Sequence, residues 1–81
     1  MRLLDTIFVS KTSRIHQKIA VKIRDIRKER DITQEKLALK VGLNRAYIGY
    51  IERGERKPSV DTLAKIAEGL GVKLHELFIF D

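Results

Sequence analysis

The feature that most constrains this chain is a pair of short helical patterns between residues 33 and 54, separated by one glycine. The first pattern places three apolar residues at helical spacing on one face: Leu37, Ala38 and Val41. Gly42 follows, and glycine adopts the left-handed backbone that ends a helix at little cost. The second pattern puts Ile48 and Ile51 on its inner face and ends at Gly54. The spacing therefore predicts two short helices that pack together across a tight turn.

Each of these helices is expected to begin at a residue that caps a helix well. The Thr33 hydroxyl and the Asn44 amide oxygen can accept hydrogen bonds from backbone amides in the turn that follows. Two helices joined in this way form a helix-turn-helix unit, whose second helix can enter a DNA major groove. The alternative is an ordinary helical hairpin in a small bundle. The small residue Ala38 and the turn glycine at their fixed offsets favour the DNA-binding form.

The same residues carry a family resemblance. The run TQEKLALKVGLNRAYIGYIERGERKPS and the downstream TLAKIAEGLGV resemble the lambda/434 phage-repressor family of helix-turn-helix domains. Within that family, LNRAYIGYIERG is similar to the small controller proteins of restriction–modification systems. The resemblance covers roughly residues 19–78 and implies an all-α, five-helix domain that binds DNA and regulates transcription.

Length and charge agree with this interpretation. Eighty-one residues form one domain with a modest core, so association with a second copy would add stability. The net charge of +6 is unevenly distributed. Residues 11–36 contain nine basic and four acidic side chains, whereas residues 61–81 contain two basic and four acidic ones. The first of these segments therefore suits a polyanion such as DNA, and the second does not.

Several classes of protein are disfavoured. The chain has no cysteine, which excludes disulfides and thiolate metal sites and fits a reducing, cytoplasmic compartment. No apolar run approaches the ~20 residues of a membrane span, and Asp5 interrupts the apolar N-terminus, which argues against a signal peptide. No histidine is paired with a carboxylate at a useful spacing, so we expect no catalytic residues, cofactor or metal.

The chain is expected to divide at residue 12. Residues 1–12 include a β-branched and aromatic patch that favours a short extended segment or strand, although a frayed, disordered terminus fits the composition equally well. Residues 13–81 are expected to form the DNA-binding domain with a C-terminal dimerisation element. Its first helix is predicted over residues 13–30, begins at Ser13 and carries an apolar stripe: Ile15, Ile19, Ile23 and Ile26.

The family resemblance also implies a structural pair between Arg27 of the first helix and Glu52 of the recognition helix. Such a pair would tie the two helices together, and loss of one partner would leave a partly buried charge unpaired. In the resembled family, a glutamine at the position of Gln34 clamps a DNA phosphate. Its place in the first turn of a helix, beside free backbone N–H groups, suits that role.

Base reading is expected from the helix that follows Asn44. Arg45, at its first position, has the fork geometry that matches guanine O6 and N7. Beside it, the methyl group of Ala46 suits thymine. Gly49 is expected to be exposed in mid-helix, where a bare backbone permits close approach to a groove; simple tolerance of glycine in a marginal helix is the alternative. Tyr50 lies on the same outer face and completes the predicted base-reading set.

Phosphate contacts are expected around this reading face. Tyr47 lies at the edge of the buried side, where packing is its alternative role. Pro58 keeps the preceding residue out of a helix, so basic side chains project from the loop that follows the second helix. The predicted phosphate contacts are Gln34, Asn44, Tyr47, Arg53, Arg56 and Lys57.

A homodimer on an inverted repeat in double-stranded DNA is expected, because one recognition helix covers only a few base pairs. The C-terminal end is the predicted interface, since it carries more large apolar residues than one small domain can bury. The predicted interface residues are Leu77, Phe78, Ile79 and Phe80. Of these, Leu77 is also expected, with Leu74, to serve the core of the protomer, which leaves the last three nearer the partner. The apolar patch at residues 7–9 could pair as a strand with residues 79–80, within or across subunits.

A different class of function remains open from the sequence. The chain could be the antitoxin of a toxin–antitoxin pair, with its tail bound to a toxin, or an adaptor that uses this fold to bind proteins. Failure of the recognition helix to bind any DNA would favour these alternatives. The polar, basic composition of residues 44–53 favours DNA instead.

Overall fold

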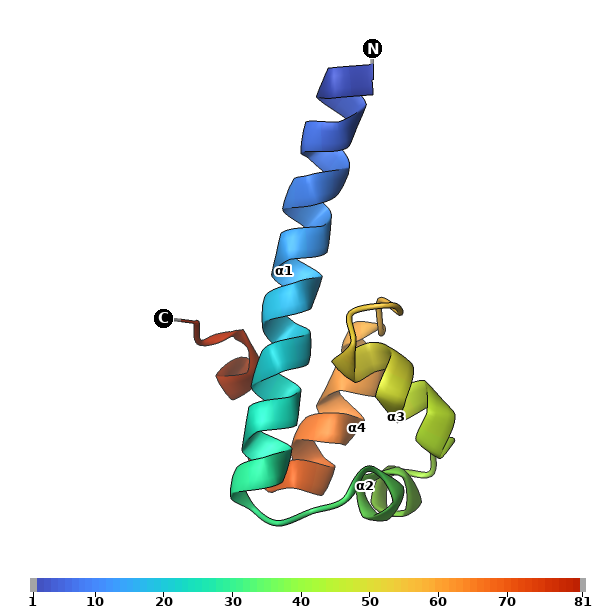
Figure 1. Cartoon of the computed structure of the whole chain (residues 1–81). Coiled ribbons are helices and arrows are strands. Elements are labelled where there is room, and N and C mark those ends of the chain that lie inside the picture. Colours follow the sequence, from blue (N-terminus) through green and yellow to red (C-terminus); the bar gives the residue numbers. More distant parts are fainter. Residues whose placement is uncertain (1, 81) are drawn as a thin grey trace.

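The computed structural model describes the backbone of residues 2–80 and the side chains from Arg14 to Phe80. The elements are α1 (Arg2–Glu29), α2 (Gln34–Val41), α3 (Arg45–Glu52), α4 (Val60–Leu70) and a 3-10 helix, η1 (Leu74–Phe78). In Figure 1, α2 and α3 lie on one side of the long α1, and the C-terminal segment lies on the other. The all-α class is confirmed for residues 2–80, which contain no strand, but the predicted fifth α-helix is a short 3-10 helix.

The helix boundaries follow from local capping, as predicted for Thr33 and Gly42. Thr33 Oγ1 accepts a hydrogen bond of 3.0 Å from the backbone N–H of Lys36. Ser59 Oγ accepts one of 3.1 Å from the N–H of Thr62 and so begins α4. Gly42 ends α2 in the left-handed conformation, with φ of 70°. Because these caps satisfy backbone groups that a short helix leaves free, they determine where each helix begins and ends.

The first helix is longer than predicted. α1 continues without interruption from Arg2 to Glu29, so a helix start at Ser13 and an extended segment or strand before it are wrong for the described backbone. The physical reason is that residues 2–29 contain no glycine or proline to interrupt a helix, while the β-preference of residues 6–9 is weak and depends on context. The N-terminal half of α1 extends beyond the other helices in Figure 1.

The core lies where α1, α2, α3, α4 and η1 meet. Its fully buried large side chains are Ile23, Leu37, Ile48, Ile51, Ile66, Leu70 and Leu77. Leu77 serves the core of the protomer, as expected, because η1 packs on both α1 and α4 and buries this side chain completely; its place among the predicted interface residues was therefore wrong. Burial of a leucine contributes about 1.5–3 kcal/mol. Ile15 is 52% exposed, so the inward stripe of α1 begins only at Ile19.

Two close approaches position the helix-turn-helix unit on this core. A Cβ on Gly69 would lie 2.5 Å from Val41 Cγ1, so the glycine allows α2 and α4 to pack closely. At the end of α1, Arg30 Nη1 donates a 3.1 Å hydrogen bond to the carbonyl of Leu70, the last residue of α4.

Within residues 2–80, no helix combines the length and apolar character needed to cross a membrane.

Candidate nucleic-acid interface

The turn between α2 and α3 orients the start of α3. Asn44 has an extended backbone, and its side-chain Oδ1 accepts a 2.7 Å hydrogen bond from the N–H of Ala46. The Asn44 side chain is therefore a helix cap, as predicted, and its amide nitrogen remains a potential donor. Asn44, Arg45 and Ala46 are all exposed. The first turn of α3 thus presents an arginine fork and a methyl group to solvent.

The two faces of α3 differ sharply. Ile48, Ile51 and Glu52 are buried. Tyr47 is half-buried and packs against the hydrophobic core. Packing was the alternative role given for this residue from the sequence. The opposite face begins with Arg45 and continues through exposed Tyr50. The buried face fixes α3 on the core, so the exposed face can bind another macromolecule without unfolding the helix.

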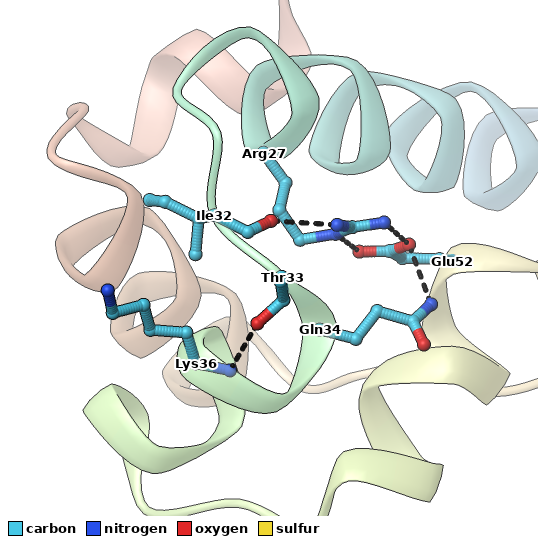
Figure 2. A network of polar contacts seen from close by, with 6 residues as sticks. All are labelled: Arg27, Ile32, Thr33, Gln34, Lys36 and Glu52. Carbon is cyan, nitrogen blue, oxygen red and sulfur yellow. Dashed lines mark hydrogen bonds and ion pairs between the residues drawn. The ribbon is translucent and has the colours of Figure 1, made fainter.

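A buried ion pair connects α3 to α1. Arg27 donates from Nε to Glu52 Oε2 at 2.6 Å and from Nη2 to Glu52 Oε1 at 2.9 Å, and its Nη1 donates to the carbonyl of Ile32 at 2.8 Å (Figure 2). Arg27 is 8% exposed and Glu52 is 3% exposed. The two parallel bonds define one relative orientation of carboxylate and guanidinium, so the pair aligns α3 with α1.

The same carboxylate orients Gln34. Gln34 Nε2 donates a 3.0 Å hydrogen bond to Glu52 Oε1, so the glutamine at the start of α2 belongs to the Arg27–Glu52 network (Figure 2). This contact could not be predicted from the sequence. Gln34 and Glu52 are 18 residues apart, and no spacing rule connects them. Among the described residues, no buried side-chain nitrogen or oxygen lacks a hydrogen-bond partner, so the network is complete.

Gly49 is buried, and the expectation that it is exposed in mid-helix was wrong. A Cβ at this position would lie 3.2 Å from Arg53 Nη1 and 3.8 Å from Gln34 Oε1. The side chains of Arg53 and Gln34 therefore cover the glycine. The Arg53 side chain is long and 53% exposed, so this part of the cover can move, whereas Gln34 is held by Glu52.

The C-terminal end of α3 carries an aromatic and cationic cluster. Arg53 Cζ lies 5.2 Å from the centre of the Tyr50 ring, and Arg56 Cζ lies 5.1 Å from it. A guanidinium at this distance is attracted to the face of an aromatic ring. Arg53 also forms an exposed ion pair with Glu55, with Nε 3.1 Å from Oε2. Lys57 is exposed in the following loop, so three basic residues flank the outer face of α3.

A second surface lies at the C-terminal segment, on the other side of α1 from α3 (Figure 1). Phe78 is 42% exposed and Ile79 is 52% exposed, whereas Phe80 is half-buried and packs against the core. Lys18 Nζ lies 5.6 Å from the centre of the Phe80 ring. An open hollow of about 490 Å³ runs along this side of α1 and is lined by residues that include Val21, Ile79 and Phe80. Exposed apolar side chains beside a hollow are typical of an interface.

Comparison with known proteins assigns the family. A family model described as helix-turn-helix (HTH_3) matches residues 23–77. Control protein C.MunI from a Mycoplasma species is 45% identical over 58 residues, covering 70% of this chain and 78% of that protein. The restriction-modification controller protein C.AhdI from Aeromonas hydrophila has a TM-score of 0.76 at 36% identity, covering 78% of this chain and 96% of that chain. The controller protein C.Esp1396I, crystallised as a tetramer with its natural 35 base-pair operator, has a TM-score of 0.75 at 39% identity, covering 79% and 84%.

The matched residues contain the part of α1 that carries Arg27, all of α2, α3 and α4, and most of η1. The resemblance to the helix-turn-helix family and to restriction–modification controller proteins is therefore confirmed. The chain belongs to the helix-turn-helix (HTH_3) family and is a DNA-binding transcriptional regulator, not an enzyme.

Proposed function

We propose that the protein binds an inverted-repeat operator as a homodimer, with α3 of each protomer in the major groove. The observation that carries this proposal is the division of α3 into two faces. Ile48, Ile51 and Glu52 hold the helix on the core, while Arg45 and Ala46 open its first turn to solvent. In helix-turn-helix proteins the N-terminal residues of the second helix contact base edges.

Base readout is assigned to the exposed side of α3. Arg45 donates from its planar fork to a guanine, and Ala46 packs against a thymine methyl group. Tyr50 is 38% exposed and lies one turn further along the same side. Gly49 lies between them and allows close approach of the helix once the side chain of Arg53 has moved aside.

Phosphate contacts are assigned to residues that flank this surface. Gln34 is supported by its bond to Glu52, which orients the amide at the N-terminus of α2, where backbone N–H groups and the helix dipole favour anions. Asn44 and Tyr47 lie at the start of α3. Arg53, Arg56 and Lys57 lie at its far end and supply positive charge.

The homodimer is assigned to the side of α1 that carries the C-terminal segment. Phe78 and Ile79 are exposed there, and Phe80 lines the adjoining hollow. This surface faces away from α2 and α3, so pairing through it leaves both recognition helices free (Figure 1). A two-fold dimer uses the same patch on both protomers, so the patch must be complementary to itself.

The order of charges along α1 supports such self-complementarity. Along α1 the hollow is lined first by basic residues, Arg14, Lys18 and Lys22, and then by acidic residues, Asp25 and Glu29. Val21, next to Lys22, is 42% exposed. If two copies of α1 cross antiparallel near Val21, Arg14 of each protomer meets Glu29 of the other. Opposite charges at the two ends of the hollow are then paired twice.

Selection of bound sequences from a pool of random duplexes tests the proposed function. We expect enrichment of a two-fold symmetric site whose half-sites are separated by about one helical turn, 10–10.5 base pairs. Footprinting should then show protection in two successive major grooves. Enrichment of no sequence, with the protein folded, would contradict the proposal and would favour a protein-binding adaptor or antitoxin. The C.Esp1396I complex with its operator supports the DNA-binding form.

A further inference from the structure

The side chain of Arg53 folds back over the recognition helix. Its Nη1 lies 3.2 Å from the position that a Cβ of Gly49 would occupy, and its Cζ lies 5.2 Å from the centre of the Tyr50 ring. Gly49 and Tyr50 belong to the side of α3 that is proposed to enter the groove. The guanidinium of Arg53 therefore covers part of the surface that DNA would have to approach.

A carboxylate holds Arg53 in this position. Glu55 accepts two hydrogen bonds from Arg53, at 3.1 Å from Nε and 3.4 Å from Nη2. Both side chains are about half exposed, at 53% and 54%. An exposed pair of this kind contributes little to stability, so another anion can replace the carboxylate at small cost. A DNA phosphate presents two acceptor oxygens with the spacing that a guanidinium fork recognises.

Arg56 provides a contrast within the same cluster. Its Cζ lies 5.1 Å from the centre of the same Tyr50 ring. Within the described part of the chain, however, the ion pairs are those of Arg27 with Glu52 and of Arg53 with Glu55, so no carboxylate holds Arg56. Of the two arginines at the ring, Arg53 alone must exchange a charged partner before it can bind a phosphate.

We propose that Glu55 is an internal competitor for DNA phosphate. In the free protein its carboxylate holds Arg53 over Gly49, and on DNA a backbone phosphate takes its place. The inference rests on the proposed function, because it requires Arg53 to meet a DNA backbone. Since a phosphate carries no sequence information, Glu55 lowers the affinity for all duplexes alike and leaves sequence preference to Arg45.

The test compares Glu55→Gln with Glu68→Gln on a labelled random-sequence duplex of about 20 base pairs, roughly two helical turns. Glu68 is exposed on α4, so its variant makes the same change in net charge away from the cluster. Glu55→Gln should tighten binding roughly two- to five-fold, the range expected for an exposed ion pair. In a salt series its log–log slope should stay close to that of the wild type, because Arg53 contacts one phosphate in both complexes and only the competing carboxylate is lost. Glu68→Gln should give a smaller gain in affinity or none.

The same pair of variants in an Arg53→Ala background separates competition from general electrostatics. If Glu55 acts by holding Arg53, the Glu55→Gln gain disappears when Arg53 is absent. An equal gain with and without Arg53, or an equal gain from Glu55→Gln and Glu68→Gln, would overturn the inference while leaving the proposed function intact. Failure of the wild-type protein to bind this duplex and any selected sequence would overturn the proposed function and the inference with it.

Discussion

Arg27 and Glu52 join α1 to α3 through two parallel hydrogen bonds, at 2.6 and 2.9 Å, between side chains that are almost fully buried. The Glu52 carboxylate also accepts from Gln34 at 3.0 Å. One buried carboxylate thus connects the first helix, the recognition helix and the residue assigned to the DNA backbone. The relative orientation of α1, α2 and α3 therefore depends on this carboxylate.

Loss of either partner should therefore be costly. Arg27→Ala and Glu52→Ala are each expected to lower the free energy of unfolding by about 3–5 kcal/mol, because the remaining charge is buried without an opposite charge beside it. Urea unfolding followed by circular dichroism measures the loss. As a matched control, Glu55→Ala removes the partner of Arg53 in an exposed pair and should cost less than about 1 kcal/mol. A double variant whose loss equals the sum of the two single losses would show that the buried residues are not coupled.

The local features of this fold could be predicted because neighbouring residues determine them. Thr33, Asn44 and Ser59 cap helices through bonds to backbone groups two or three residues away. The left-handed Gly42 likewise ends α2 by a local rule. The all-α class and the helix-turn-helix unit follow from such signals together with the apolar spacing.

The remaining features depend on how distant segments meet. The cover over Gly49 requires Arg53 and Gln34 to converge from two elements, and the fit of Gln17 against Gly54 brings α1 to the end of α3. Neither convergence has a periodic signature in the sequence. The start of α1 was missed for a different reason, since the chain before Gly42 lacks the glycine or proline that would mark a boundary.

The end of α1 offers a stabilising substitution. Asp31 has a positive φ of 56°, and the N–H of Ile32 bonds to the carbonyl of Arg27 at 3.0 Å across this turn. Glycine has no Cβ to strain this conformation, so Asp31→Gly should raise the free energy of unfolding by about 0.5–1 kcal/mol. Thermal unfolding is the measurement. Asp31→Ala keeps a Cβ and should give no gain; stabilisation by alanine instead would assign the effect to the loss of the carboxylate.

Arg45 should determine base preference at one position of each half-site. Arg45→Ala is expected to cost about 1–3 kcal/mol on the selected operator and to relax discrimination at that position. Titrations on the operator and on its single-base variants measure both effects. Lys57→Ala serves as the control, because loss of a phosphate contact should weaken all sequences alike and reduce the salt slope by about one. Equal losses for Arg45→Ala on operator and random DNA would exclude base readout by this residue.

Phe78 and Ile79 should hold the dimer together. In Phe78→Glu with Ile79→Glu, two carboxylates per protomer would be buried in the interface without partners, so the dimer should dissociate and operator affinity should fall. Both side chains are exposed in the protomer, so it should remain helical. Leu39→Glu is the matched control, since Leu39 is 79% exposed on α2 and should not affect association. Sedimentation velocity measures the association state of the double variant and of the control. A double variant that stays dimeric would exclude the C-terminal segment as the interface.

The charge order along α1 predicts the geometry of that dimer. If Arg14 of one protomer meets Glu29 of the other, Arg14→Glu places like charges together at two symmetric positions and should weaken the dimer by up to about 2 kcal/mol. Glu29→Arg should do the same. The variant with both changes restores two opposite-charge pairs with exchanged signs and should recover the wild-type dissociation constant, most clearly at low salt. Sedimentation equilibrium measures all four proteins. A double variant as weak as the two single variants combined would mean that the two copies of α1 do not cross antiparallel near Val21.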